Sequence, residues 1–506
     1  MLYTLIFGYQ FNCGDQAEHL PQVYQKLNPQ LYPNDFFLNL YHQTFTVRFY
    51  WVEMVTFFSR LFPVWFVCFS FYLLCLVFSI YAWIKIAYHF TESKWTSYIS
   101  VVLIFILLNK FTVGGNQLQG NIFIASNISE VFASFAILLF LKNKFKGAVL
   151  SLAISSLFQV LIGFQLWVLI TGVVVFSRKD KWLLHATVFS ITYIILSLPI
   201  LIPLLSKQFL IAVQYDKELY FKTVYVYRSI LHFKPSLFPI SDYLKFGIIL
   251  VPSMLILWFK NIKDKKFIWI FILLILFGSV CYALLIDVAG VNEIGKLQWF
   301  KTTVWVNAFC CLLLSKFIVD SFQKYFMYID VLNNSVIYLV LSILIFALTL
   351  NGKYLPIEKF KSRYQIGNYQ QTDLQIVHQW VKNNTPNDAI FLVSPLDDAF
   401  ACEAQRSQPV NFKAVVHEPF YFTKWYKAMQ DYYNVDFEKV GNHMAITQAE
   451  YYYEHLIKYP LNNLAQYRID NVNECKEIAD ELDSVLFKSG NWIVTKIDDR
   501  PSRLIW

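Results

Sequence analysis

Three ionisable side chains lie within five positions near the start of the chain: Asp15, Glu18 and His19, in GDQAEHLP at residues 14–21. On a helix, Asp15 and His19 would share a face, because residues four apart are neighbours. A carboxylate in a partly desolvated site can accept a proton as a general base, and an imidazole can orient or carry that proton. Asp15 followed at the third position by Glu18 has the spacing of a capping box at a helix start, and His19 is also typical of a hydrogen-bonded structural histidine. Both interpretations stay open, since a capping carboxylate can still present an oxygen to a ligand.

The composition is typical of a membrane protein. Hydrophobic residues make up 57% of the 506 positions and charged residues 15%, against about 25% charged residues in a soluble domain. Several apolar runs approach the roughly 20 residues that a helix needs to cross a bilayer. We expect membrane spans near residues 62–90, 96–112, 125–141, 147–177, 182–205, 243–259, 267–286, 300–319 and 335–350.

Short loops rich in lysine and arginine predict the orientation, because cytoplasmic loops carry the excess of these residues. Such loops are KNKFK at 142–146, SRKDK at 177–181 and KNIKDKK at 260–266. Alternation of the spans between the two sides then requires residues 147–177 to enter the membrane and return to the cytoplasm. Gln159 and Gly163 lie near the middle of this stretch. We therefore expect two short helices joined by a turn here, and about eleven helices in total.

The predicted topology places the first loop, residues 13–61, outside the membrane. Loops 113–124, 206–242 and 287–299 lie outside as well, with everything after about residue 351. Asp15 then lies just beyond the membrane, where a carboxylate can be ionised and still face lipid headgroups. The apolar residues 1–11 are too few to span and lack the basic region of a signal peptide. Either the true start lies upstream, or a short helix opens the fold.

From residue 351 the pattern becomes mixed and polar over about 150 residues, an ordinary domain size. We therefore divide the chain into a transmembrane domain at 1–350 and an extracytoplasmic α/β domain at 351–506. Hydrophobic periodicity in the second domain predicts alternating helices and strands. The expected order is helix 373–384, strand 389–395, strand 408–416, helix 418–433, strand 465–471, helix 474–487 and strand 491–498.

Common soluble motifs are absent from the sequence, which has no CxxC, Walker loop or HExxH. The net charge of +8 is largely what positive cytoplasmic loops require, so we expect no nucleic-acid partner. Most of the eight cysteines fall in predicted spans, where a thiol behaves as a small buried hydrophobe. Cys402 and Cys475 can pair if the outside compartment is oxidising.

Four stretches carry a resemblance to a family: residues 15–39, 145–166, 297–305 and 380–395. With the acidic first loop, the many spans and the external C-terminal domain, the chain resembles the GT-C superfamily of polyprenyl-phosphate-sugar-dependent membrane glycosyltransferases. More closely, it resembles an uncharacterised bacterial multi-pass family of this type. Relatives often have histidine where Gln159 stands and arginine where Lys301 stands, so the chain departs from the pattern at both positions.

The resemblance implies a reaction and a location. A sugar would pass, with inversion, from a polyprenyl-phosphate carrier to a glycan, lipid or protein acceptor on the extracytoplasmic face of a bacterial inner membrane. Asp15 would then be the base or a metal ligand, and Glu18 and His19 would bind substrate. The lipid phosphate that leaves would need a cation, for which Lys296 and Lys301 are candidates. Gln298 lies between these two lysines as a further substrate-binding candidate, although interfacial lysines also commonly snorkel at helix ends.

Asp35 is the second external carboxylate that the resemblance selects. Asp15 and Asp35 would together form a minimal site for Mg²⁺ or Mn²⁺, or Asp35 would orient the acceptor. An Asn-Asp pair of this kind is also typical of a turn or a helix cap. Within the spans, Glu130 is an ionisable group that would face the external cavity or pair with Lys110.

Four other basic residues have open roles. Arg48 and Arg60 would steer anionic headgroups or the carrier phosphate if they do more than cover the surface. Arg406 and Lys413 resemble basic positions of the family, where they would close over the catalytic cavity or only cap the fold.

Two other classes of function remain as alternatives. A transporter or flippase of lipid-linked sugars would usually show duplicated halves and interrupted helices with midplane charges. We find no convincing repeat, and the paired short helices are expected once. A catalytically inactive scaffold of an envelope complex would tolerate replacement of Asp15.

Overall fold

The computed structural model describes residues 7–42, 44–107, 112–177, 181–210, 215–323, 365–367, 372–433, 435–440, 465–471 and 485–497. The chain divides into two compact units. The helical unit comprises Met1–Tyr9, Phe69–Leu205 and Leu231–Tyr364, and the mixed unit comprises Gln10–Cys68, Ser206–Ile230 and Gln365–Trp506. Two segments predicted to be external, in the first loop and in loop 206–242, thus belong to the same unit as the C-terminal residues.

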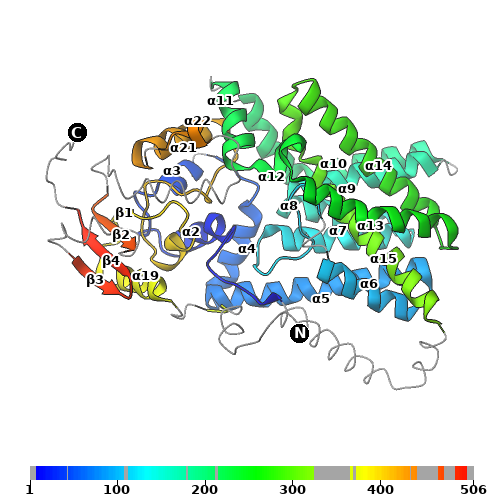
Figure 1. The fold of residues 1–506 in the computed structure, drawn as a ribbon, viewed down its shortest axis with the longest axis horizontal. Coiled ribbons are helices and arrows are strands. Elements are labelled where there is room, and N and C mark those ends of the chain that lie inside the picture. Colours follow the sequence, from blue (N-terminus) through cyan, green and yellow to red (C-terminus); the bar gives the residue numbers. More distant parts are fainter. Residues whose placement is uncertain are drawn as a thin grey trace, which may run out of the picture. The chain divides into compact units, whose positions relative to one another are not determined.

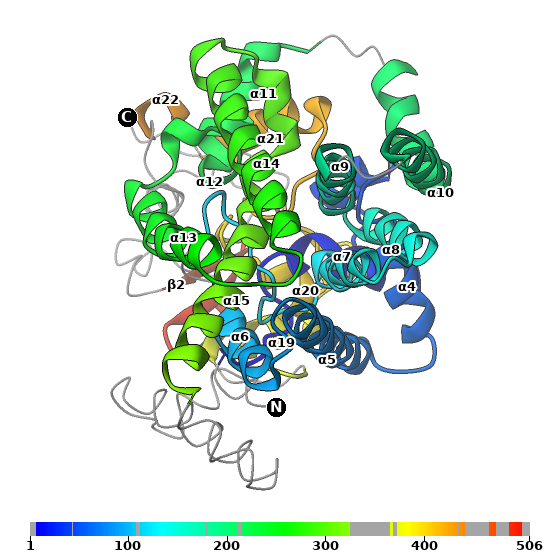
Figure 2. The same ribbon diagram turned by 90° about the vertical axis from the view of Figure 1, so that its right-hand side faces the viewer.

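The helical unit is a bundle of apolar helices (Figure 1). Its long helices are α5 (Val64–Thr91), α6 (Lys94–Leu107), α7 (Ala125–Leu141), α8 (Phe145–Phe158), α9 (Val160–Ser177), α10 (Trp182–Leu210), α13 (Ile240–Phe259), α14 (Lys265–Ala283) and α15 (Thr303–Ser321). Figure 2 shows α5, α7, α8, α9 and α10 nearly end-on, so the axes of these helices are roughly parallel or antiparallel to one another. Helix α15 packs against α6 and α13, α7 packs against α8, and α14 packs against α9.

Short helical segments connect the bundle helices. These are α12 (Ile230–Phe233), the 3₁₀ turns η2 (Pro235–Leu237), η4 (Asn292–Leu297) and η5 (Trp299–Thr302), and the π-helix η3 (Leu284–Val288). Aromatic rings fill the centre of the bundle, where Trp83 lies 5.9 Å from Phe309 between ring centroids. Large apolar side chains such as Trp258 and Phe277 are exposed instead, as expected for surfaces that meet lipid.

Six helical segments of the described chain are long and apolar enough to cross a membrane, and three shorter apolar helices accompany them. The prediction of a polytopic α-helical fold is therefore confirmed. The expected division of residues 147–177 into two helices is also confirmed, since α8 ends at Phe158 and Gln159 has extended backbone before α9 begins. Helix α6 ends at Leu107, and the span expected at 335–350 lies outside the described residues.

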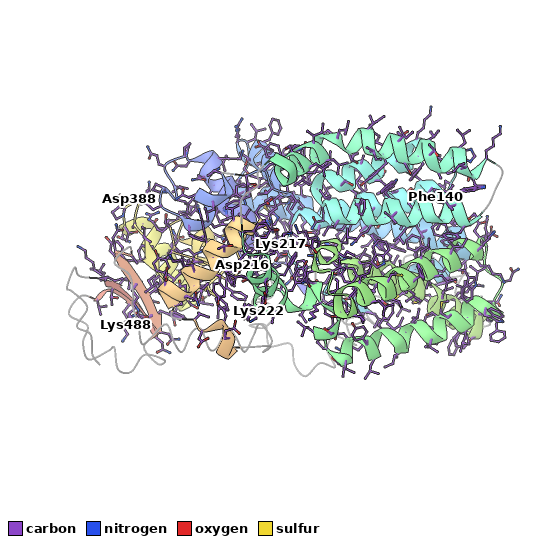
Figure 3. The ribbon with its side chains drawn as sticks, turned by 90° about the horizontal axis from the view of Figure 1, so that it is seen from above. Phe140, Asp216, Lys217, Lys222, Asp388 and Lys488 are labelled. Carbon is purple, nitrogen blue, oxygen red and sulfur yellow. The ribbon has the colours of Figure 1, made fainter. Side chains whose placement is uncertain are left out.

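Several short helices precede the C-terminal part of the mixed unit. They are α2 (Gln16–Leu27), α3 (Phe36–Tyr41), α4 (Phe49–Ser59), α11 (Lys217–Lys222) and the π-helix η1 (Thr223–Arg228). Helix α11 begins where the Asp216 carboxylate accepts a hydrogen bond from Leu219 N, 3.0 Å away. It ends at Lys222 (Figure 3), whose ammonium pairs with Glu438.

The C-terminal part of the mixed unit combines a small sheet with helices, so the predicted α/β character is confirmed. Helices α19 (Asp373–Asn384), α20 (Phe400–Glu403), α21 (Pro419–Tyr433) and α22 (Phe437–Val440) accompany β1 (Phe391–Leu392), β2 (Tyr467–Asn471), β3 (Val485–Ser489) and β4 (Trp492–Lys496). The described strands follow the order β1-β2-β4-β3, with β1 parallel to β2 and the other pairs antiparallel. Helix α19 begins with a capping box of Thr372 and Gln375 and buries Val377 and Val381 in the core beside the sheet.

Two predictions for the C-terminal part are wrong. Residues 408–416 do not form a strand, because local side-chain bonds hold this segment as a loop: Asn411 Oδ1 accepts from Lys413 N at 2.6 Å and Ala414 N at 2.9 Å. Val485, Leu486 and Phe487, expected at the end of a helix, begin strand β3. A two-residue turn with Gly490 at a φ of 56° joins β3 to β4, and the SGN sequence at this turn is a hairpin signal. Most of the predicted helix 474–487 lies outside the described residues.

Candidate functional site

Asp15 lies immediately before helix α2 in the mixed unit, but it does not cap this helix. Its side chain makes no capping hydrogen bond, so the capping-box interpretation is wrong. The carboxylate instead pairs with Lys413, with 2.6 Å between Lys413 Nζ and Asp15 Oδ1. This ion pair joins the first loop to the loop that precedes α21.

The Asp15 carboxylate is ionised and still accessible. Burial alone would raise its pKa, but the charge and hydrogen bond of Lys413, with smaller contributions from His19 and Arg48, hold the pKa well below its usual range. Protein atoms surround the group closely, yet its side chain remains 44% exposed. A carboxylate that is charged at neutral pH is thus accessible from solvent.

Two further cations, Arg48 and Arg228, act on Asp15 electrostatically. Arg48 forms a buried ion pair with Glu18. The Arg228 guanidinium lies 4.9 Å above the Phe412 ring and donates from Nη2 to the Lys413 carbonyl at 2.8 Å. Burial lowers the pKa of both arginines to about 10, so both stay charged at neutral pH.

Lys413, Arg48 and Arg228 form what we term the cation cluster, which faces the carboxylates of Asp15 and Glu18. The Asp398 carboxylate also interacts electrostatically with Lys413 and Asp15, so the three cations face three acidic groups. Among the residues that the structure describes, Arg228 Nε is buried without a hydrogen-bond partner. The sequence analysis missed Arg228, although a basic residue in the aromatic stretch of an external loop is a usable signal.

The backbone around Asp15 is fixed by the segment that leads into helix α20. Gly14 N donates to Asp398 Oδ2 at 2.6 Å, and Tyr32 OH donates to the Ala401 carbonyl at 2.6 Å. The Cys402 thiol lies 3.7 Å from the Gln16 carbonyl oxygen, while Cys475 lies outside the described residues. Burial raises the pKa of Asp398 to about 6. The 397–402 segment therefore positions Asp15 through its two sequence neighbours.

His378 of α19 holds this segment in turn. Its ring is fully buried, with Nε2 at 2.9 Å from Asp397 Oδ2 and Nδ1 at 2.8 Å from Glu403 Oε2. Burial alone would lower the pKa of His378, but the two carboxylates raise it to about 9. The ring is thus an imidazolium at neutral pH and donates to both acids. Sequence reasoning missed this residue, because its partners lie 19 and 25 positions away.

The other first-loop candidates have identifiable contacts. His19 Nδ1 hydrogen-bonds the Asp15 carbonyl, its ring packs edge-on against Trp51, and burial lowers its pKa. Glu18 is engaged by Arg48. Asp35 Oδ1 accepts from Leu38 N at 3.0 Å at the start of α3, and Oδ2 accepts from Gln408 N at 3.3 Å. Burial raises the pKa of Asp35 to about 6.

Lys296, Gln298 and Lys301 belong to the helical unit, in and between η4 and η5. Gln298 has a φ of 45°, and its carbonyl and that of Leu297 both accept from Gln165 Nε2. Lys301 interacts electrostatically with the buried Glu130, whereas Lys110 lies outside the described residues.

Arg406 caps the fold rather than facing Asp15. Its Nη2 donates to the carbonyls of Lys382 at 2.7 Å and Thr385 at 2.6 Å, at the end of α19. Arg60, in contrast, is exposed at the end of α4.

A divalent cation at Asp15 stays a prediction. Within the described parts of the chain, no three His, Cys, Asp or Glu side chains come together in a way that could hold a metal ion. Asp35 directs both oxygens to backbone N–H groups, and Lys413 pairs with Asp15 Oδ1. Both carboxylates therefore already have partners in the described part of the chain.

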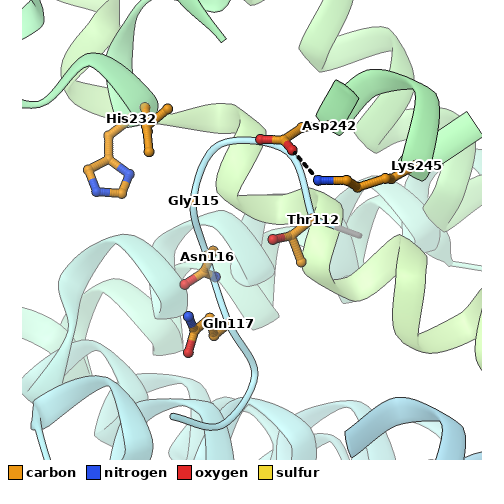
Figure 4. Close-up of a pocket in the computed structure, with 8 residues that line it drawn as sticks. Thr112, Gly115, Asn116, Gln117, His232, Asp242 and Lys245 are labelled. Atoms are coloured by element: carbon orange, nitrogen blue, oxygen red, sulfur yellow. Dashed lines mark hydrogen bonds and ion pairs between the residues drawn. The ribbon is translucent and has the colours of Figure 1, made fainter. Parts of the chain in front are cut away.

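A separate polar pocket of about 480 Å³ lies in the helical unit (Figure 4). Its walls come from the loop after α6, from α12 and from the first two turns of α13. The lining residues are Thr112, Gly115, Asn116, Gln117, Leu231, His232, Asp242 and Lys245.

Comparisons with known proteins identify one family model and a set of similar structures. Residues 372–432, which contain α19, α20 and Lys413, match a domain of unknown function, DUF6798. No curated protein matches the sequence. Both structures described next are of the oligosaccharyltransferase from Archaeoglobus fulgidus. The AglB complex with an inhibitory peptide and a dolichol-phosphate has a TM-score of 0.46 and 13% identity, over 94% of this chain and 69% of that chain.

The apo form of the Archaeoglobus enzyme has a TM-score of 0.45 and 12% identity, over 93% of this chain and 67% of that chain. Similarity at this level of identity concerns the fold only.

Proposed function

We propose that this protein is a membrane glycosyltransferase that moves a sugar from a polyprenyl-phosphate donor to an acceptor on the extracytoplasmic face. The observation that carries the proposal is the accessible, ionised Asp15 carboxylate beside the cation cluster of Lys413, Arg48 and Arg228. A glycosyl transfer needs both parts, because one group must accept a proton while another compensates the charge of a departing phosphate.

In the proposed reaction, the acceptor hydroxyl attacks the anomeric carbon of the donor sugar. Its proton passes to an Asp15 oxygen as the new C–O bond forms. The bond between the anomeric carbon and the phosphate oxygen breaks, and the electron pair leaves with the phosphate toward the cation cluster. Attack from the face opposite the phosphate inverts the anomeric centre.

Lys413 has two tasks in this scheme. Its ion pair with Asp15 holds the pKa of the carboxyl low, so Asp15 is a weak base while the pair is intact. A phosphate bound at the cluster would draw the Lys413 ammonium toward itself, since the two charges attract. The basicity of Asp15 would then rise when the donor is in place, which limits the chemistry to the loaded site.

The test is transfer of labelled sugar by purified protein in lipid, from a panel of polyprenyl-phosphate donors, comparing wild type with Asp15→Asn at equal folded yield. The asparagine side chain has nearly the same size but cannot accept the proton, so we expect transfer to fall by about 100-fold or more. Asp388→Asn is the matched control, because Asp388 is an exposed residue of the same unit, and its transfer should equal that of wild type.

Each other result has a defined meaning. Equal transfer by wild type and Asp15→Asn would remove Asp15 from the mechanism. Absence of transfer by both, with every donor, would contradict the transferase function and favour the transporter or scaffold alternative. Loss of wild-type activity with EDTA and its recovery with Mg²⁺ or Mn²⁺ would show that transfer requires a divalent cation.

A further inference from the structure

The polar pocket of the helical unit has the size and chemistry of a ligand site. Its volume of about 480 Å³ falls within the roughly 300–1,000 Å³ typical of small-molecule pockets. Leu231 contributes a large apolar side chain to its wall, and the other side chains there carry hydroxyl, amide, imidazole, carboxylate or ammonium groups. Such a wall suits a ligand that forms many hydrogen bonds.

The wall does not attract a net charge. Asp242 and Lys245 pair with each other in the first two turns of α13, with 3.1 Å between Lys245 Nζ and Asp242 Oδ1 (Figure 4). A bound phosphate would lie beside the Asp242 carboxylate, whose charge offsets that of the lysine. The pair instead presents an acceptor next to several donors. Two neighbouring hydroxyl groups, each able to donate and accept, are the natural complement of this arrangement.

The opposite part of the wall is a loop whose shape is fixed by two glycines. Gly114 and Gly115 have φ values of 83° and 67°, which only glycine adopts readily. A Cβ at Gly115 would lie 2.6 Å from His232 Cε1, so the glycine lets the imidazole pack directly on the loop. His232 Nδ1 also lies 3.1 Å from the Gly114 carbonyl oxygen.

Hydrogen bonds then set the orientation of the loop. Thr303 Oγ1 donates to the Val113 carbonyl at 2.8 Å, and Asn116 Nδ2 donates to the Lys301 carbonyl at 3.3 Å. This hydrogen bond uses the Asn116 amide nitrogen and orients the side chain, so the amide oxygen remains as an acceptor. Gln117 follows Asn116 along the wall (Figure 4) and adds both a donor and an acceptor.

We propose that this pocket binds a neutral saccharide, with Asp242 and Lys245 holding adjacent hydroxyls and Asn116 and Gln117 holding others. The site goes beyond the proposed transferase function, because a sugar-binding pocket would serve a transferase or a transporter alike. Its test therefore measures binding and requires no transfer.

The experiment uses saturation-transfer NMR on the purified full chain in detergent micelles. The probes are the methyl glycosides of glucose, galactose, mannose, rhamnose and N-acetylglucosamine, with inorganic phosphate and glycerol phosphate titrated by calorimetry. We expect at least one glycoside to bind and neither phosphate to compete with it. Gln117→Ala and Lys245→Met should each lower the affinity for that glycoside by about three- to tenfold, the effect of one or two lost hydrogen bonds.

Lys263→Met is the matched control, because Lys263 also pairs with a carboxylate of the helical unit, at 2.8 Å from Glu92 Oε1. The Lys263→Met protein should bind the glycoside with the affinity of wild type. Binding of no glycoside, equal weakening by Lys263→Met, or displacement of the glycoside by phosphate would each overturn the proposal. Glycoside binding that persists in an Asp15→Asn protein without transfer activity would support the pocket while leaving the transferase question to the donor assay.

Discussion

At the scale of single residues, charge determines what each site can bind. Asp15 lies among three cations, Lys413, Arg48 and Arg228, which act on it electrostatically. His378 shows the reverse arrangement, a single imidazole between two carboxylates. The first centre is open to solvent and suited to chemistry, whereas the second is buried and suited to holding structure.

The His378 centre predicts a pH dependence of stability. Because the folded pKa of about 9 lies above the usual value of about 6.5, the stabilisation is fully present below pH 6.5 and is lost as the pH rises through 9. The free energy of unfolding should fall by on the order of 3 kcal/mol in total. The measurement is thermal unfolding of the purified protein between pH 6.5 and 9.5.

The variant His378→Gln should flatten that part of the stability profile. His185→Gln, at an exposed histidine, is the control and should keep the wild-type slope. Asp35 and Asp398, whose pKa values are raised to about 6, titrate below this window. A wild-type profile without any decline toward pH 9 would contradict a charged His378.

At the scale of elements, the turn between α8 and α9 depends on close backbone contact. Helix α9 folds back on α8 at Gln159, and Gly163 then lies against the preceding helix. A Cβ at Gly163 would lie 2.7 Å from Ser156 N and 2.9 Å from the Leu152 carbonyl oxygen. Both atoms belong to the backbone, so neither can move without shifting the helix.

We therefore expect Gly163→Ala to destabilise the protein by about 1–3 kcal/mol, the usual cost of overpacking. Gly247→Ala in α13 is a matched control, because a Cβ there would meet nothing within 4 Å. That change should be neutral or stabilise by about 0.5–1 kcal/mol through helix propensity. Thermal unfolding in one detergent compares the two, and equal melting temperatures would contradict the close contact at Gly163.

At the scale of the whole molecule, the two units draw on segments that are distant in the sequence. The mixed unit combines residues 10–68 and 206–230 with the C-terminal part, and the predicted topology assigns most of these residues to the outside. The basic loops 142–146 and 260–266, in contrast, belong to the helical unit. The predicted topology therefore assigns Asp388 (Figure 3) to the outside and Lys142 to the cytoplasm.

Cysteine labelling tests this topology. Asp388→Cys should react with a membrane-impermeant maleimide in intact cells, whereas Lys142→Cys, at the end of α7, should react only after permeabilisation. The parent protein gives the background from native thiols, of which Cys13 and Cys281 are partly accessible. Labelling of Lys142→Cys in intact cells, or protection of Asp388→Cys, would overturn the orientation.

Features that depend on local pattern could be predicted from the amino-acid order alone. Apolar runs predicted the bundle helices, Gln159 and Gly163 predicted the break in residues 147–177, and amphipathic periodicity predicted α19 and α21. These predictions succeed because helix formation depends on residues within a few turns of one another. The local rule failed at Asp15, where Lys413 outcompeted the backbone N–H groups of α2 for the carboxylate.

The pairing of distant residues, in contrast, became visible only in the folded chain. Gly14 and Asp398 are 384 positions apart, and His378 reaches acids on a different helix and its leading turn. Arg228 enters the Asp15 site from a third segment. Long-range pairs of this kind arise when whole elements pack and exclude water, so their partners follow from the path of the chain and not from spacing. The sequence alone therefore identified Asp15 as a candidate site residue. Only the folded chain showed which charged side chains surround it.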